Sequence, residues 1–129
     1  MVKRIRIPGR RETVEPRLVE AFAEEGFGLL SRIPFDEVLR AKRGVDMPPY
    51  LRLGFCHPEL AERALEVAPE LGTVLPCGVV LREVEDGVEV LVLDPQAAFQ
   101  AAGVEGLPTL AEEVRRRVEA ALGRLGVPT

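Results

Sequence analysis

Apolar residues alternate with polar ones along several short stretches of this chain, a period of two that is typical of strands with one buried face. In residues 2–7, valine and isoleucine stand between lysine and arginine. In residues 27–33, the side chains of Phe27, Leu29 and Ile33 are expected to share one face. The pattern as a whole predicts five strands, over residues 2–7, 27–33, 50–55, 73–84 and 88–93.

Apolar residues at spacings of three and four predict the helices that accompany these strands. Thr13 is expected to cap the first helix and Gly26 to end it. Thr109 and Glu112 have the spacing of a capping box at the start of the last and longest helix. Shorter helices are predicted over residues 36–42 and 96–102, and from Pro58 to an exit at Pro69. The apolar stripe of the last helix consists of Leu110, Val114, Val118, Ala121, Leu122 and Leu125.

The connections between these elements indicate the fold class. Asp86 and Gly87 separate two strand-like runs, which predicts a tight hairpin between the last two strands. Glycine-rich phosphate loops of the dinucleotide-binding kind are absent from the sequence. The order of elements therefore predicts a single α+β domain over residues 1–129, with a largely antiparallel sheet of about five strands and helices packed on one face.

Length, charge and cysteine content limit the classes of function. The chain has 129 residues, enough for one domain, and a net charge of −4, which argues against a nucleic-acid-binding surface. No apolar run reaches the ~18 residues of a membrane span, and the N-terminus lacks the apolar segment of a signal peptide. A cytoplasmic location is therefore expected, and two cysteines fit that compartment. The absence of asparagine and the excess of arginine over lysine favour a heat-adapted protein.

The reactive side chains gather in one stretch, residues 50–81, which contains both cysteines, the only histidine and the only tyrosine. Cys56 and His57 come directly before Pro58, where a helix N-terminus would favour a thiolate at Cys56. Free cysteine is, however, more often a buried apolar side chain, and His57 suits a helix N-cap. Cys56 is thus a weak catalytic candidate, while Tyr50, Cys56, His57 and Cys77, with the loop at residues 47–50, are expected to surround a ligand pocket.

Other kinds of site find little support in the sequence. Cys56, His57 and Cys77 could supply at most three metal ligands, at spacings unlike those of zinc sites, so no metal and no cofactor is predicted. His57 has no hydroxyl nucleophile in a recognisable motif beside it. Whether the two sulfur atoms approach each other depends on which strands are neighbours, and both arrangements stay open.

Four short motifs occur in order along the chain: Glu25-Gly26-Phe27, Leu53-Gly54-Phe55-Cys56-His57-Pro58, Leu75-Pro76-Cys77 and Asp94-Pro95. Taken together, they resemble the domain of unknown function 302 family over roughly residues 1–125. The family pattern has asparagine where this chain has His57. The resemblance implies a compact α+β fold similar to the TATA-binding-protein-like class, with a curved antiparallel sheet, and it suggests homodimers. It implies no activity.

Three functional hypotheses follow from these observations. The leading hypothesis is a homodimeric ligand-binding or regulatory domain without catalytic activity, which binds a small molecule and neither nucleic acid nor membrane. The second is a thiol-based redox protein or cysteine-dependent enzyme that uses Cys56 with Cys77. The third is a structural protein-interaction module that pairs through a sheet edge.

Overall fold

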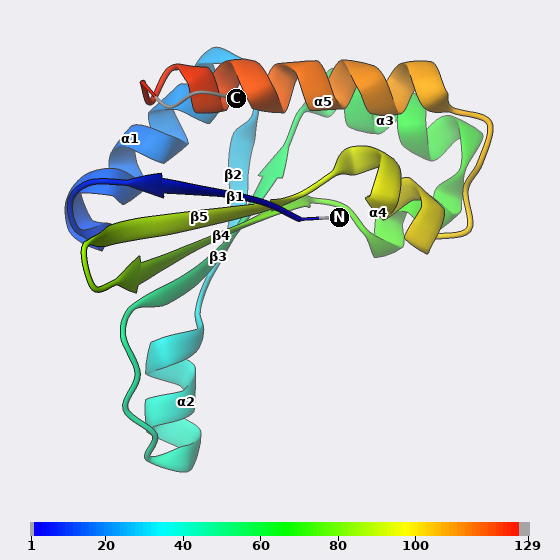
Figure 1. Ribbon diagram of the computed structural model, residues 1–129. Helices are drawn as coiled ribbons and strands as arrows, with labels where there is room; N and C mark the ends of the chain where they lie inside the picture. The colour runs from blue at the N-terminus through cyan, green and yellow to red at the C-terminus, as the bar shows by residue number, and fades with distance from the viewer. Residues whose placement is uncertain (1, 127–129) are drawn as a thin grey trace.

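The computed structural model describes residues 2–126, which form one antiparallel sheet with helices mainly on one side (Figure 1). The order of strands across the sheet is β1-β5-β4-β3-β2, so every strand pairs antiparallel with its neighbours. The prediction of an α+β fold with five antiparallel strands is confirmed. The strands are β1 (Val2–Ile7), β2 (Gly28–Pro34), β3 (Tyr50–Cys56), β4 (Cys77–Val84) and β5 (Gly87–Leu93).

The helices differ in how they meet the sheet. Figure 1 shows α5 running across the top of the sheet with α1 and α3 on the same side, whereas α2 projects away below it. No helix within residues 2–126 is long and apolar enough to cross a membrane. The helices are α1 (Arg11–Glu24), α2 (Phe35–Arg43), α3 (Pro58–Val67), α4 (Pro95–Ala101) and α5 (Pro108–Gly123), and a 3₁₀ turn, η1 (Pro69–Thr73), follows α3.

The core lies between the sheet and these helices, as the alternation along the strands requires. Leu51, Leu53 and Phe55 point from β3 toward the helices and are at most 2% exposed. Phe55 stacks on Phe22 of α1, with ring centroids 4.4 Å apart. The six residues of the predicted stripe are all buried, five on α5 and Leu125 just beyond its end at Gly123, which confirms that α5 covers the sheet.

Two predicted helix caps are wrong because each helix begins earlier than its capping residue. Helix α1 begins at Arg11, since the backbone N–H of Val14 already donates to the carbonyl of Arg10 at 2.9 Å. The Thr13 side chain lies in the first turn, where its hydroxyl donates to that carbonyl and accepts the backbone N–H of Arg10 at 3.4 Å, so Thr13 takes part in a capping box without being the N-cap residue. Helix α5 begins at Pro108, whose fixed φ suits the first helical position, so Thr109 is not a cap.

Two details of the predicted strands, the start of β4 and the register of β2, also need correction. Strand β4 begins at Cys77 and not at residue 73, because η1 continues into a turn in which the N–H of Val74 donates to Leu71. In β2, the register shifts between Leu29 and Ser31. Leu29 is therefore paired with a residue of the helix-facing row, while Ile33 is paired with Arg52 on the opposite face.

Candidate functional site

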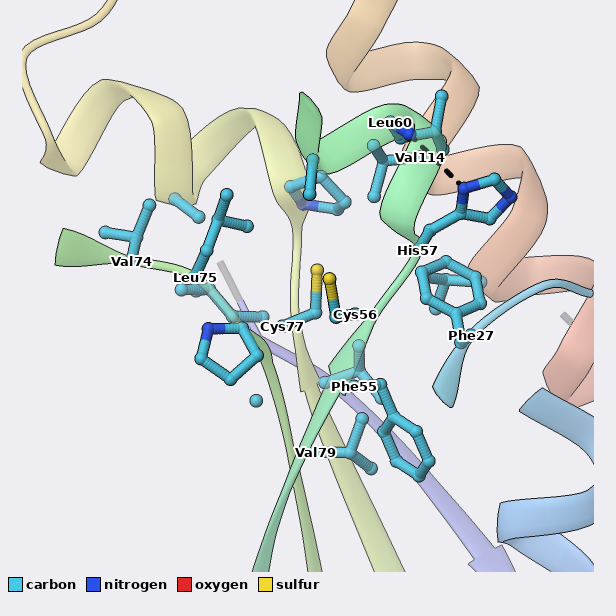
Figure 2. Close-up of a pocket in the computed structure, with 18 of the residues that line it drawn as sticks. Phe27, Phe55, Cys56, His57, Leu60, Val74, Leu75, Cys77, Val79 and Val114 are labelled. Atoms are coloured by element: carbon cyan, nitrogen blue, oxygen red, sulfur yellow. Dashed lines mark hydrogen bonds between the residues drawn. The ribbon is translucent and has the colours of Figure 1, made fainter. Parts of the chain in front are cut away.

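A cavity of about 420 Å³ lies at the end of the sheet where β3 ends and β4 begins (Figure 2). The helices α3, α4 and α5 contribute to its walls, and so do residues from both faces of the sheet. Most of the lining is apolar, and the volume falls in the range of ~300–1,000 Å³ that is usual for small-molecule sites. The polar side chains in the lining are those of Arg52, Cys56, His57, Thr73 and Cys77.

Cys56 and Cys77 meet in this cavity. Cys56 is the last residue of β3, and Cys77, the first of β4, is paired with Phe55. Figure 2 shows the two sulfur atoms side by side, pointing toward the cavity between α3 and α4. Both thiols are free and half-buried. The neighbouring position of β3 and β4 thus decides the question that the sequence left open.

The electrostatic surroundings of Cys77 favour its protonated form. Burial, and secondarily the neighbouring Cys56, raises the pKa of the Cys77 thiol to about 11, although its own backbone and the guanidinium of Arg52 act in the opposite direction. At neutral pH Cys77 is therefore a neutral thiol, because a thiolate would lose hydration in this apolar setting. This agrees with the interpretation of Cys77 as a packed, unreactive side chain.

His57 stands at the wall of the cavity and caps α3. Its Nδ1 accepts the backbone N–H of Leu60 at 3.3 Å, so the expected N-cap is confirmed. In the neutral ring, the proton then lies on Nε2. The ring contacts the edge of Phe27, with centroids 5.4 Å apart. A Cβ atom on Gly26 would come within 2.6 Å of Nε2, so a glycine is needed there for the imidazole to pack.

Tyr50 does not belong to this cavity. It is the first residue of β3, whereas Cys56 is the last, and six steps along a strand separate them by roughly 20 Å. The ring of Tyr50 contacts Phe35 at the start of α2, and its backbone N–H donates to the buried carboxylate of Asp36 at 3.0 Å. The structure therefore brings together Cys56, His57 and Cys77 but leaves Tyr50 and the loop at residues 47–50 at the other end of the sheet.

Arg52 is the cavity residue that the sequence analysis missed. It lies between Leu51 and Leu53 on β3 and points to the face opposite the helices. A Cβ atom on Gly78 would lie 2.6 Å from Nη2 and 2.9 Å from Cζ of Arg52, so the guanidinium occupies the space that a side chain at position 78 would fill. The sequence pattern that could have identified Arg52 is a charged residue inside an otherwise apolar strand.

The residues that the structure describes do not form a metal site at this cavity. Across residues 2–126, no group of three histidine, cysteine, aspartate or glutamate side chains is arranged to hold a metal ion. The polar groups of the cavity are two thiols, the hydroxyl of Thr73, one imidazole that caps a helix, and one guanidinium. Such a set suits binding of an organic molecule better than coordination of a cation.

Comparison with known proteins places this geometry in a family. No curated protein matches the chain. The fold is similar to the crystal structure of an uncharacterized conserved protein DUF302 from Bacillus stearothermophilus, with a TM-score of 0.88 and 26% identity over 96% of this chain and 97% of that chain. The sequence model of the domain of unknown function DUF302 matches residues 4–125. Because this match covers nearly the whole chain, the protein belongs to the DUF302 family.

Proposed function

We propose that this protein is a small-molecule-binding domain whose ligand occupies the cavity beside Cys56 and Cys77. The observation that carries the proposal is the cavity of about 420 Å³, apolar over most of its lining, with a few polar side chains among the lining residues. Each methylene group that moves from water into such a site contributes about 0.8 kcal/mol. An apolar molecule of moderate size therefore gains enough free energy there to bind measurably.

The test is whether filling the cavity abolishes binding of an apolar probe, 1-octanol. Ala98 and Ala97 are both half-buried on α4, but only Ala98 lines the cavity. We expect Ala98→Leu to abolish the binding measured by calorimetry, and the matched control Ala97→Leu to retain it. Equal binding to both variants, or none to the wild type, would contradict the proposal.

A thiol-based redox activity is the second candidate, favoured by the adjacent sulfur atoms in Figure 2. A Cys56 thiolate would attack a low-molecular-weight disulfide and release one thiolate; Cys77 would then lose its proton, attack Sγ of Cys56 and release the second. Incubation with oxidised glutathione should then remove two hydrogen masses from the protein. Persistent reduced thiols, or only a mixed disulfide, would contradict this candidate.

Pairing of two copies through the sheet face opposite the helices forms part of the same proposal. This face presents the apolar side chains of Val2, Ile33 and Leu93, which are 49%, 37% and 42% exposed. Ile33 lies outside the cavity lining. We expect Ile33→Arg to shift the protein to monomers in sedimentation, whereas Val67→Arg, on the exposed side of α3, should not. A wild-type monomer at micromolar concentration would contradict the pairing.

A reducing compartment and a high working temperature complete the proposal. Free thiols at Cys56 and Cys77 are compatible with the cytoplasm. Arg124 forms ion pairs with both Glu24 and Glu25, a small network of the kind that supports proteins at high temperature. A thermal midpoint well above the ~45–65 °C of mesophilic domains would support heat adaptation, and a midpoint inside that range would contradict it.

A further inference from the structure

Arg52 differs from the other half-buried arginines in lacking a partner. Within residues 2–126 four arginines are half-buried, and three of them, Arg11, Arg82 and Arg115, form ion pairs with glutamates. For Arg52, no carboxylate of that part of the chain lies within ion-pairing distance, and its guanidinium donates no hydrogen bond there. Partial burial without a counter-charge costs free energy, so the unpaired guanidinium of Arg52 is unfavourable in the protein alone.

The local structure holds the guanidinium at the wall of the cavity. Arg52 and Gly78 both line it, and the guanidinium lies over the glycine, where a Cβ atom would approach Nε, Cζ and Nη2 to within 2.6–3.1 Å. The charge of the guanidinium also acts on the cavity, since Arg52 acts to lower the pKa of the Cys77 thiol. The five N–H donors of a guanidinium therefore stand at the edge of an apolar site.

The charge balance of the lining is one-sided. Among residues 2–126, Arg52 is the only permanently charged side chain of the lining, and no aspartate or glutamate of that range contributes to it, although the protein as a whole carries a net charge of −4. An apolar cavity with one unpaired cation at its wall is complementary to a molecule with an apolar body and one anionic group.

We infer that the ligand of this cavity is an apolar acid whose anionic head group pairs with Arg52. The inference rests on the proposed small-molecule function and specifies its chemical class. The flat guanidinium can donate two parallel hydrogen bonds to a carboxylate, while the apolar body extends along Val80 and Leu91, which line the cavity on the same sheet face as Arg52. Ten heavy atoms, at roughly the 30 Å³ that one water molecule occupies in the liquid, fill about 300 Å³, so an acid of the size of octanoate fits.

The experiment compares octanoate with 1-octanol, which has the same chain and no charge. Calorimetry on the wild type should give a dissociation constant for octanoate at least tenfold lower than that for octanol, because hydrogen bonds to charged groups are the stronger ones. Arg52→Met keeps an unbranched side chain but removes the charge. It should weaken octanoate about 10- to 100-fold and leave octanol nearly unchanged, whereas Arg52→Lys should fall between.

Arg43→Met is the matched control, because Arg43 is an exposed arginine on α2, far from the cavity lining. Equal affinities of the wild type for octanoate and octanol would overturn the inference and leave the cavity function standing. If neither octanoate nor 1-octanol bound to the wild type, both the inference and the proposed cavity function would be overturned. If Arg52→Met weakened a homodimer and left octanoate binding intact, the guanidinium would pair with a second copy of the chain, which also overturns the inference.

Discussion

The reactivity of Cys77 offers a direct check on the chemistry of the cavity. Burial raises the pKa of this thiol from an ordinary value of 9.0 to about 11, which lowers the thiolate fraction at pH 8 about 100-fold. A more basic thiolate is a better nucleophile, with a Brønsted coefficient of about 0.4–0.5, which recovers roughly a factor of 8. Native Cys77 should therefore be alkylated at least roughly tenfold more slowly than the same residue in the unfolded chain.

The assay is alkylation with iodoacetamide from pH 7 to 11, read by mass spectrometry of the two cysteine peptides. The rate at Cys77 should keep rising through pH 10, and Cys56→Ala should move its midpoint down, because Cys56 is the second cause of the raised pKa. Guanidinium-unfolded protein provides the reference rate. A native rate equal to that reference at pH 8, with a midpoint at or below 9, would contradict a raised pKa of the Cys77 thiol.

The same pKa shift predicts how stability depends on pH. A raised pKa in the folded state means that folding favours the protonated thiol of Cys77. This contribution is complete below the unfolded value near 9 and is lost as the pH rises toward 11. Chemical denaturation should therefore show a fall in the free energy of unfolding over that window that is smaller in Cys77→Ala. An identical pH dependence in both proteins would contradict the assignment.

Two further predictions concern the sheet. A Cβ atom on Gly54 would lie 2.3 Å from Oγ of Ser31 and 2.8 Å from Cγ of Pro76. Gly54→Ala should therefore lower the free energy of unfolding by about 1–3 kcal/mol, or the thermal midpoint by roughly 4–11 °C. The control Gly28→Ala should change the midpoint little, because a Cβ atom there would meet no other atom within 4 Å. Thermal unfolding checks both, and equal midpoints would contradict the steric reading. Glu15 accepts hydrogen bonds from Arg32 at 2.6 and 3.2 Å, which lower the pKa of its carboxyl, so Glu15→Gln should cost about 1 kcal/mol at pH 7. That difference should shrink as the pH falls below about 4.5 and the wild-type carboxylate is protonated; denaturation at pH 3 and 7 measures it, and a pH-independent difference would contradict the assignment.

The local elements, and the side of each that is buried, follow from the pattern of apolar and polar residues alone. Alternation along β3 required Leu51, Leu53 and Phe55 to face the helices, because successive side chains of a strand point to opposite sides. The predicted tight hairpin is present, although its two turn residues are Glu85 and Asp86, and Gly87 already pairs with Val84 as the first residue of β5. The spacing of apolar residues determined which face of α5 is buried. These are short-range properties, fixed by backbone geometry and the hydrophobic effect within a few residues.

Some local predictions were nevertheless displaced by a few residues. The helices α1 and α5 begin before Thr13 and Thr109, since several residues near a helix start can serve as its first turn. The bulge after Leu29 puts Leu29 and Ile33 on different faces of the sheet. The alternation of apolar and polar residues along β2 does not predict the extra residue. Such shifts depend on how one element packs against another.

The composition of the candidate site depends instead on contacts between residues that are distant in sequence. Cys56 and Cys77 are 21 positions apart, and their meeting depends on β3 pairing with β4. The same pairing set Arg52 over Gly78 at the cavity wall. Tyr50 belongs to the same sequence stretch as the cysteines but lies far from them, because six steps along the extended strand β3 separate it from Cys56. Strand order and register result from packing over the whole domain, which a local pattern of polar and apolar residues does not contain.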